Sequence, residues 1–455
     1  MSLPVSPLPT PAGPLDQIEA TLQELLPRFL PPDPQTRGPG RPEVLSSSLL
    51  WTGLLVGMLR GGRTQTDLWR LLGQTGLWTH PRVPIGAEGV RKRLVQAGPG
   101  VMEQLFVDIT AELAVRTPGS TELAPHFPGI YAIDDTTLDQ VARTLPSLRP
   151  VKTGDDRLLP GKLSSVLDVR TQQFVRIDPT EQPHRNPKVA LPEMVAELPP
   201  GSLLLFDLGY FAFERFDALS HQGLHYVSRL REKTSVRVIE PITDEPQARD
   251  TLVWLGKHRS NQAGYAVRLI EVELGGVWYR YVTNVRDPAR LSVAEVVQLY
   301  ARRWDIELAF KTLKVDLGVG LLWSAKWELI LTQVWAAVIL YQIAQSIRMQ
   351  IADRAAVDPF DVSLRLVLRE LPHLMRRGEP DPIGIIVGLP RGKGCFIRPS
   401  SRSQPHIPAI QTVVILPPQT VVTRVAHYAG RKSGPDRTNV PPRTVDYGLK
   451  RLGDN

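Results

Sequence analysis

The hydrophobic pattern of the chain changes twice along its length. Residues 45–127 carry apolar side chains at helical spacing, as in Leu49–Leu59 and Thr66–Leu72. From residue 128 to residue 290 the apolar side chains come in short runs rich in β-branched and aromatic residues, which favour strands. Helical spacing returns at Ser292. This order predicts an α/β fold with helical regions on both sides of a sheet.

Two of the predicted strands end directly on a carboxylate. Ile130–Ile133 is followed by Asp134, and Ser202–Phe206 is followed by Asp207. Open sheets often place chemistry at strand ends, although an aspartate there also commonly caps a turn. Either interpretation accounts for each aspartate taken alone. The other predicted strands are Leu163–Val169, Phe174–Ile177, Tyr226–Arg231, Val236–Ile239, Tyr265–Leu274 and Val277–Val285.

A long helix is predicted from Ser292 to about Asp316, because Ser292 and Glu295 form a capping-box pattern. At about 3.6 residues per turn, four polar side chains of this helix fall within roughly 60° of one another, beside an apolar face. An ion pair between side chains four residues apart would explain only the second and third of them. The four are Tyr300, Arg303, Glu307 and Lys314. Two further helices are predicted at Ala325–Arg354 and Val362–Arg377.

The composition excludes several classes of protein. With 455 residues, 42% of them apolar, the chain can bury a large core. A single cysteine, Cys395, excludes an internal disulfide and a zinc site built from two or four cysteines. The N-terminus lacks a basic-then-apolar leader, and the clean apolar stretch Val334–Tyr341 is too short to span a membrane. We therefore expect a soluble protein of a reducing compartment.

The positive charge is concentrated at the C-terminal end. The net charge is +8, and residues 391–455 hold 11 Lys and Arg against 3 Asp and Glu, which leaves 43 of each sign in residues 1–390. A basic tail suits a polyanion such as nucleic acid, or a solvated segment that aids solubility. A second basic run, Arg91, Lys92 and Arg93, ends a short predicted helix. It fits either a helix-turn-helix that reads DNA or a small bundle with a solvated face.

The four polar residues of the long helix belong to a recognisable string. From Tyr300 to Lys314 the sequence follows the pattern Y-x₂-R-x₃-E-x₆-K. This pattern resembles the signature of DDE-type transposases of bacterial insertion sequences, in the group called insertion-sequence family four. The segments around Asp134 and Asp207 resemble the first and second aspartate segments of that family, with Asp135 where the family usually has glycine. Asp134 directly follows the strand and is the preferred ligand.

The resemblance implies a fold and a chemistry. It implies a ribonuclease H-like mixed sheet flanked by helices and interrupted by a β-rich insertion. It also implies that Asp134, Asp207 and Glu307 are the catalytic residues and hold Mg²⁺ or Mn²⁺, two ions in all. Converging carboxylates repel one another unless cations lie between them, and their hard oxygen atoms suit these metals. Two such ions can activate an attacking oxygen and stabilise a leaving oxygen at a phosphodiester.

Further residues are implied to contact DNA. Tyr300, Arg303 and Lys314 would bind backbone phosphates near the scissile bond. Arg229, Arg231 and Trp278 could contact the transposon end, where an aromatic ring can stack on an extruded base, although Trp278 could equally be a core residue of a small sheet. The basic run of Arg91, Lys92 and Arg93 is the candidate reader of the terminal repeat.

We divide the chain into seven segments. They are a proline-rich arm with a short helix at Leu15–Phe29 (1–44), a helical N-terminal domain (45–127), the two parts of a catalytic domain (128–225 and 291–350), a β-rich insertion (226–290), a C-terminal helical region (351–390) and a basic tail (391–455). The tail has weak strand patterns at Thr412–Leu416 and Thr420–Val425, so we expect it to lie partly over the body or to lack order of its own.

The sequence therefore predicts a metal-dependent DNA transposase. It would bind the terminal inverted repeats of its element in double-stranded DNA, cut at the ends and join them to target DNA, as a homodimer or higher oligomer. We expect it in the bacterial cytoplasm, associated with the nucleoid when bound to DNA, and not at a membrane. The alternatives are a catalytically silent DNA-binding relative and a ribonuclease H-like nuclease without transposition.

Overall fold

The computed structural model describes residues 44–77, 80–116, 123–138, 159–258, 261–376, 381–402 and 422–428. The predicted helix at Leu15–Phe29 and the strand pattern at Thr412–Leu416 lie outside these residues.

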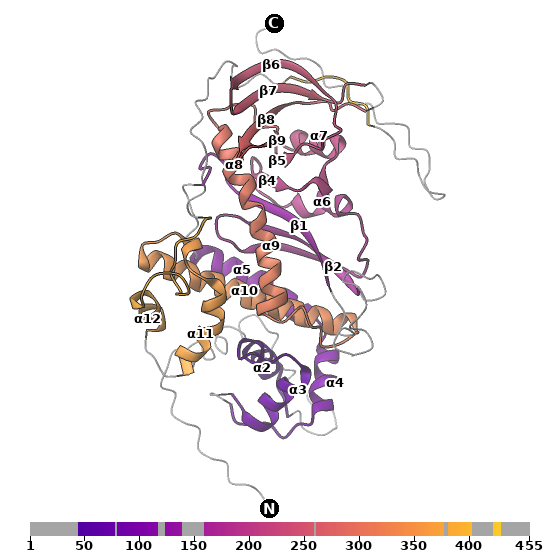
Figure 1. The fold of residues 1–455 in the computed structure, drawn as a ribbon. Coiled ribbons are helices and arrows are strands. Elements are labelled where there is room, and N and C mark those ends of the chain that lie inside the picture. The colour runs from indigo at the N-terminus through magenta and orange to yellow at the C-terminus, as the bar shows by residue number, and fades with distance from the viewer. Residues whose placement is uncertain are drawn as a thin grey trace, which may run out of the picture.

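A single sheet organises the described part of the chain (Figure 1). Its nine strands lie in the order β3-β2-β1-β4-β5-β9-β8-β7-β6. Their bounds are β1 Ile130–Leu138, β2 Gly161–Asp168, β3 Phe174–Thr180, β4 Leu203–Phe206, β5 His225–Arg229, β6 Val236–Glu245, β7 Ala248–Leu255, β8 Ala266–Leu274 and β9 Val277–Thr283.

The first five strands form a mixed sheet. Strands β1, β4 and β5 run parallel, while β2 pairs antiparallel with both β1 and β3. Three antiparallel strands followed by two strands parallel to the first are the arrangement of a ribonuclease H-like fold. The predicted fold class is therefore confirmed.

The β-rich insertion continues this sheet. Strand β9 pairs antiparallel with β5, so that Val227 lies opposite Thr283. The predicted strand at Tyr226–Arg231 thus supplies β5 of the first five strands, and the insertion begins after it. Strand β6 runs further than predicted, past a register shift at Pro241, and β7 was not predicted at all. Proline is tolerated in an edge strand such as β6, but it hides the strand pattern in the sequence.

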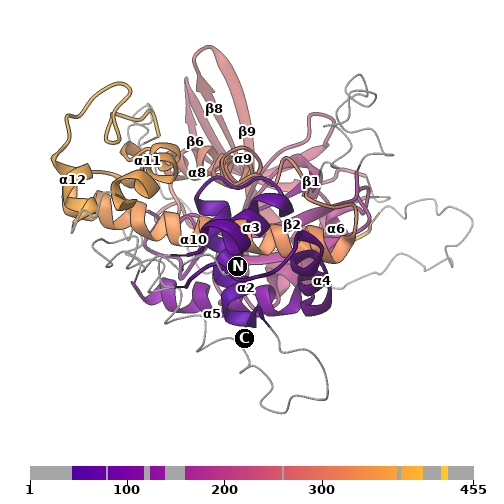
Figure 2. The same ribbon diagram turned by 90° about the horizontal axis from the view of Figure 1, so that it is seen from below.

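Helices cover both faces of the sheet (Figure 2). On one face α6 and α7 pack against Tyr131, Ile133 and Phe206. On the other face α8, α9 and α10 pack against the sheet together with the N-terminal helices. The helices are α2 Ser47–Leu59, α3 Gln65–Arg70, α4 Ala87–Ala97, α5 Gly100–Arg116, α6 Pro187–Val195, α7 Phe213–His221, α8 Val293–Arg302, α9 Trp304–Lys311, α10 Trp327–Ala355, α11 Leu364–Arg376 and α12 Pro382–Gly388. Short helical turns are η1 Leu71–Thr75, η5 Leu208–Tyr210, η6 Thr312–Asp316 and η7 Pro359–Asp361.

Helix α10 is the core helix of the protein. In the described part of the chain it is the one helix long and apolar enough to cross a membrane, yet 83% of its apolar window is buried inside the protein. Its Trp335 packs against Phe106 of α5, with ring centroids 5.2 Å apart. Such burial is what the central helix of a globular domain shows. The predicted helix at Ala325–Arg354 is confirmed.

The predicted long helix from Ser292 to Asp316 is present in three consecutive parts. Ser292 caps α8 through the expected capping box with Glu295. The helix is interrupted at Arg303, continues as α9 and ends in the π-helical turn η6. Because a π turn holds more residues per turn than an α-helix, Lys314 lies off the line that regular spacing predicts.

Part of the basic tail lies on the insertion. Thr423 and His427 form isolated bridges with Tyr265 and Gln262. The guanidinium of Arg424 donates to three carbonyl groups at the edge of β7, of Leu255, Gly256 and Ala263. The prediction that the tail drapes partly over the body is therefore confirmed for residues 422–428, although only isolated bridges replace the predicted strand.

A fully buried ion pair joins β7 and β8. Arg268 and Asp250 are both 0% exposed, and Arg268 Nη1 also donates to the carbonyls of Val285 (3.2 Å) and Leu291 (2.7 Å), just before α8. We expect Arg268→Leu to lower the free energy of unfolding by about 3–5 kcal/mol, because it leaves the buried charge of Asp250 unpaired. Urea unfolding would measure this loss. Arg249→Leu removes an exposed arginine from the neighbouring β7 and should cost less than about 1 kcal/mol; equal losses would contradict the assignment.

Candidate active site

The first two candidate carboxylates lie side by side where the parallel pairing of β1 with β4 ends, although β1 itself runs on to Leu138 beside β2 and so does not end at Asp134 as predicted. The last paired residues of β1 and β4 are Ile133 and Phe206, and Asp134 and Asp207 are the next residue on each strand. Ile133 and Phe206 point into the α6–α7 face of the sheet. Because side chains alternate along a strand, both aspartates point to the opposite face, where α9 lies.

The third carboxylate comes from α9, which crosses this face. Ile306, Ala309 and Phe310 are buried and fix the helix against the sheet. Glu307 lies between them on the helix and stays partly exposed. The Nη1 atom of Arg303, one turn earlier, lies 2.9 Å from Glu307 Oε1 and 3.6 Å from Asp134 Oδ2. The guanidinium therefore joins the carboxylates of two different elements.

The carboxylates are close enough to affect one another's charge. The pKa of Asp134 is raised to about 7, chiefly by burial and further by the negative charges of Asp207 and Glu307, while the backbone N–H of Asp135 and the Arg303 guanidinium oppose the shift. A carboxyl group with this pKa is about half protonated at neutral pH. Negative charge at this point of the structure therefore lacks sufficient compensation from the protein alone.

The donor set fits a hard divalent cation. Carboxylate oxygens are the ligands that Mg²⁺ and Mn²⁺ prefer, and a cation would relieve the repulsion that raises the pKa of Asp134. Within the described residues, no group of three His, Cys, Asp or Glu side chains is drawn together as a ready coordination shell. The Arg303 guanidinium lies between Asp134 and Glu307 instead. The carboxylates thus have the ligand atoms that these metals prefer, and the guanidinium of Arg303 balances part of their negative charge.

The carboxylate of Asp135 is bound to residues on the opposite face of the sheet from Asp134. It points to the α6–α7 face, where its Oδ2 lies 2.5 Å from Lys162 Nζ and its Oδ1 accepts a hydrogen bond of 2.9 Å from the hydroxyl of Tyr210. This arrangement favours Asp134 as the first ligand, as predicted from the sequence.

Arg303 has donors to spare. Its side chain is 6% exposed, Nε completes no hydrogen bond within the described residues, and Nη1 meets the carboxylates of Glu307 and Asp134 only as ion pairs. Buried donors without acceptors are rare and costly in native proteins. An anion that enters the site would satisfy them.

Tyr300 belongs to a cluster of aromatic rings and arginines beside the carboxylates. It is buried, and its ring lies 5.0 Å from that of Tyr281 on β9. The guanidinium groups of Arg229 and Arg303 lie over it, 5.6 Å and 5.8 Å from the ring centroid. Burial raises the pKa of Tyr300, while both arginines oppose the shift. The sequence grouped Tyr300 with Arg303, and the structure adds Arg229 to them.

Arg231 and Trp278 face away from this cluster: Arg231 contacts Phe211 of the α6–α7 core, and Trp278 points to the same face of β9 as Val282. Arg231 lies over Phe211 and donates to the carbonyl of Leu208, so it borders the segment that follows Asp207. Trp278 is 41% exposed on β9, with Arg249 5.1 Å from its ring centroid. It is therefore not the core residue that the sequence left open as an alternative.

The basic run of α4 is partly occupied by contacts within the protein. Arg91 pairs with Glu88 through two hydrogen bonds of 2.7 and 2.8 Å, and Arg93 donates to the carbonyl of Leu45. Lys92 is exposed. The helix lies at the end of the molecule remote from the β-rich insertion (Figure 1).

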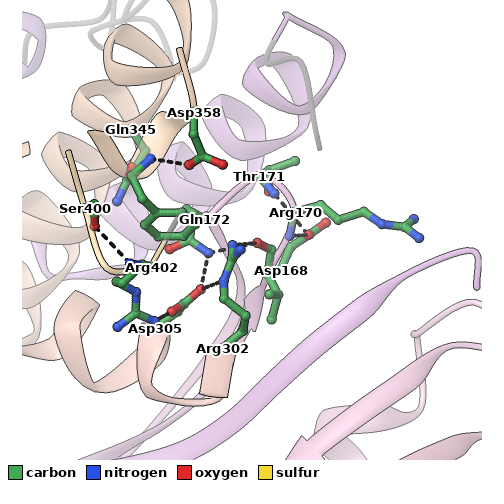
Figure 3. A network of polar contacts seen from close by, with 12 residues as sticks. Asp168, Arg170, Thr171, Gln172, Arg302, Asp305, Gln345, Asp358, Ser400 and Arg402 are labelled. Atoms are coloured by element: carbon green, nitrogen blue, oxygen red, sulfur yellow. Dashed lines mark hydrogen bonds and ion pairs between the residues drawn. The ribbon is translucent and has the colours of Figure 1, made fainter. Parts of the chain in front are cut away.

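Asp305 is a site neighbour that sequence reasoning missed. Its carboxylate is fully buried and accepts from Arg302 Nε (2.7 Å) and Gln172 Nε2 (2.8 Å), and Arg402 from the tail segment also contacts it (Figure 3). A carboxylate on the apolar side of the long helix was the signal that could have revealed it. The network ties the helix of Glu307 to the turn between β2 and β3. Trp304, also missed, exposes its ring next to Arg303.

Comparisons with known proteins match the part of the chain that carries these carboxylates. Residues 125–343 match the family described as transposase DDE domain. The transposase for insertion sequence element IS231F of Bacillus thuringiensis subsp. israelensis is 30% identical over 160 residues, which are 34% of this chain and 33% of that protein. Transposase InsG for insertion sequence element IS4 of Escherichia coli is 25% identical over 166 residues, 34% of this chain and 36% of that protein. The matched segments span about a third of these relatives.

One solved structure is also similar, a piggyBac transposase synaptic complex with hairpin DNA. It has a TM-score of 0.41 and 10% identity, and covers 83% of this chain and 82% of that one. Residues 125–343, which carry Asp134, Asp207 and Glu307, thus match the family described as transposase DDE domain, and the relatives that they resemble are transposases of bacterial insertion sequences.

Proposed function

We propose that this protein is a transposase that binds the terminal inverted repeats of an insertion sequence, cuts the DNA at the element ends and joins them to target DNA. The observation that carries the proposal is the buried Arg303 guanidinium, which has unsatisfied donors and lies between Asp134 and Glu307. A phosphodiester is the anion that would satisfy these donors and also place a scissile bond against the three carboxylates.

Each residue of the site has a part in this reaction. Asp134, Asp207 and Glu307 would hold divalent cations, two in the proposal, through their carboxylate oxygens. When bound, such ions supply an activated oxygen nucleophile and stabilise the leaving oxygen. Arg303 would turn from the carboxylates to the phosphate, with Lys314 and the hydroxyl of Tyr300 as further phosphate contacts. The attacking oxygen would come first from water and then from a DNA 3′-hydroxyl.

The wider surface would hold the transposon end. Arg231 borders the segment after Asp207, Arg229 lies over the ring of Tyr300, and Trp278 exposes its ring on β9. A flat aromatic ring beside cations suits an unstacked base and its phosphates. Lys92 and the rest of α4 would read the repeat further away, and the pairing of two ends would require at least a dimer. The protein would act in the bacterial cytoplasm, on the nucleoid when bound to DNA.

Loss of one carboxylate should abolish cutting without abolishing binding. We expect wild-type protein with Mg²⁺ or Mn²⁺ to make discrete cuts at both ends of a plasmid-borne element, and Glu307→Ala to make none. Mapping of the cleaved strand ends would measure both. Glu214→Ala, on α7 across the sheet, should cut like the wild type. Binding of the repeats without cutting by the wild type would indicate a silent relative, and scattered cuts would indicate a plain nuclease.

Arg229 should contribute one phosphate contact. Arg229→Ala is expected to weaken binding to a terminal-repeat duplex and to reduce the slope of log K against log salt concentration by about one. Fluorescence anisotropy at several salt concentrations would measure this slope. Arg176→Ala, which removes a cation from β3 at the other end of the sheet, should leave the slope unchanged. Equal slopes for Arg229→Ala and wild type would remove Arg229 from the interface.

The crowding of charge should be visible as a pH-dependent stability of the metal-free protein. The pKa of Asp134 rises from its ordinary value to about 7 on folding, so its ionisation opposes folding increasingly as the pH rises from about 4 to 7. We expect Asp134→Asn in EDTA to unfold at the same temperature as wild type near pH 4 but at a higher temperature at pH 8, a gain on the order of 2–4 kcal/mol. Asp353→Asn, on the exposed side of α10, should show no such trend. A stability difference that does not change with pH would contradict the assignment.

A further inference from the structure

A closed circuit of polar contacts lies behind the candidate catalytic carboxylates, on the α6–α7 face of the sheet. It starts at Asp135, which stands where the family that the sequence resembles usually has glycine. The alternation of β1 sends this side chain away from Asp134, into a region bounded by α6 and the segment that follows β4. The carboxylate of Asp135, although adjacent in sequence to Asp134, therefore lies outside the candidate metal site.

The first part of the circuit is a buried ion pair. Lys162 lies opposite Thr137 on β2, and Asp135 lies opposite Ser164, so Lys162 reaches Asp135 along the diagonal of the strand pair. The lysine is only 4% exposed, and its Nζ lies 2.5 Å from Asp135 Oδ2. A buried carboxylate is costly unless it is paired and hydrogen-bonded. The lysine removes this cost and cancels a charge that would add to those of Asp134 and Asp207.

The second part runs through the start of α6. Lys162 also donates to the carbonyl of Arg185, immediately before the residue that caps α6. From the second residue of the helix, Lys188 Nζ donates to the carbonyl of Phe211 at 2.9 Å. These contacts hold the helix against the segment that continues from Asp207.

The circuit closes at Tyr210. Its hydroxyl donates to Asp135 Oδ1 at 2.9 Å, and its ring packs 5.5 Å from that of Phe206. Asp135 is the residue after Asp134, and Tyr210 is the third residue after Asp207. The hydrogen bond between them is a direct link between the two chain segments that carry the candidate ligands. Strand β4 has only four residues, so its own pairing gives Asp207 little support.

We propose that Asp135 and Tyr210 are positioning residues, which hold Asp134 and Asp207 at the separation that divalent cations need. The inference rests on the proposed function of these two carboxylates as metal ligands. Asp134 and Asp207 repel each other, so the chain ends that carry them tend to move apart when no cation is present. The hydrogen bond on the far face of the sheet resists this movement without placing a further group in the site.

The test is a titration of the full-length protein with Mn²⁺, followed by electron paramagnetic resonance. Mn²⁺ bound at the candidate site is identified as the part of the bound signal that is absent in Asp134→Asn. We expect Tyr210→Phe to weaken this binding about tenfold, the size of effect known for residues that orient metal ligands. Binding of Tyr210→Phe to a terminal-repeat duplex in EDTA should equal that of wild type, because the hydroxyl that is removed bonds to Asp135 and to none of the proposed DNA contacts.

A matched control separates positioning from general loosening of β1. Tyr131→Phe makes the same chemical change on the same face of β1, at a hydroxyl outside the circuit, and should bind Mn²⁺ like wild type. Asp135→Asn, which keeps an oxygen acceptor for Tyr210, should lose less affinity than Tyr210→Phe. Unchanged affinity in Tyr210→Phe, or an equal loss in Tyr131→Phe, would overturn the proposal and leave the transposase assignment intact. Absence of any Asp134-dependent Mn²⁺ binding in the wild type would overturn both.

Discussion

The structure depends on the parallel pairing of β1 with β4. This pairing ends at Ile133 and Phe206 and so leaves Asp134 and Asp207 next to each other, where two like charges would not gather in a flexible chain. The pKa of Asp134, raised to about 7 chiefly by burial and further by its acidic neighbours, reports the cost. The rest of the domain compensates for this repulsion in two ways. Apolar cores on both faces of the sheet hold β1 and β4 in place, and α9 brings the guanidinium of Arg303 to the carboxylates.

The consecutive helices α8 and α9 place the Arg303 guanidinium beside the carboxylates. The capping box fixes where α8 begins, and the buried Ile306, Ala309 and Phe310 fix which side of α9 faces the sheet. With those positions set, Arg303 must lie between Asp134 and Glu307. The arginine is an imperfect counter-charge, since its Nε–H has no acceptor in the described part of the chain. The site thus has carboxylates that need more positive charge and an arginine that needs a further acceptor. A phosphodiester that arrives together with divalent cations would supply both.

Local patterns in the sequence were sufficient to predict the parts of the site but not their support. A strand that ends before Asp207 and a capped helix that carries Tyr300, Arg303 and Glu307 are properties of short segments, and the structure has both. Strand β1 instead runs past Asp134 to Leu138, because β2 pairs with it, and the π-helical turn takes Lys314 out of the predicted stripe. The contact between Asp135 and Tyr210 joins residues 75 positions apart, and Lys162 lies 27 positions from Asp135, so no local pattern reveals either. Strand β7 was missed because Asp250 interrupts its apolar run. That carboxylate is buried only because Arg268 of the next strand pairs with it.

The β-rich insertion is held in a fixed position because it continues the core sheet. Because β9 pairs with β5, Tyr281 of the insertion packs on Tyr300 of α8, and Arg229 of β5 lies over the same ring. A loosely tethered subdomain would present Trp278 at a variable distance from Asp207. In one continuous sheet, that distance is fixed by hydrogen-bonded strands. The tail segment 422–428 adds to this rigidity, because Arg424 bonds to three carbonyls at the edge of β7. A base stacked on Trp278 would then determine which phosphate reaches Arg303, so the sheet itself would set the position of the cut relative to the DNA end.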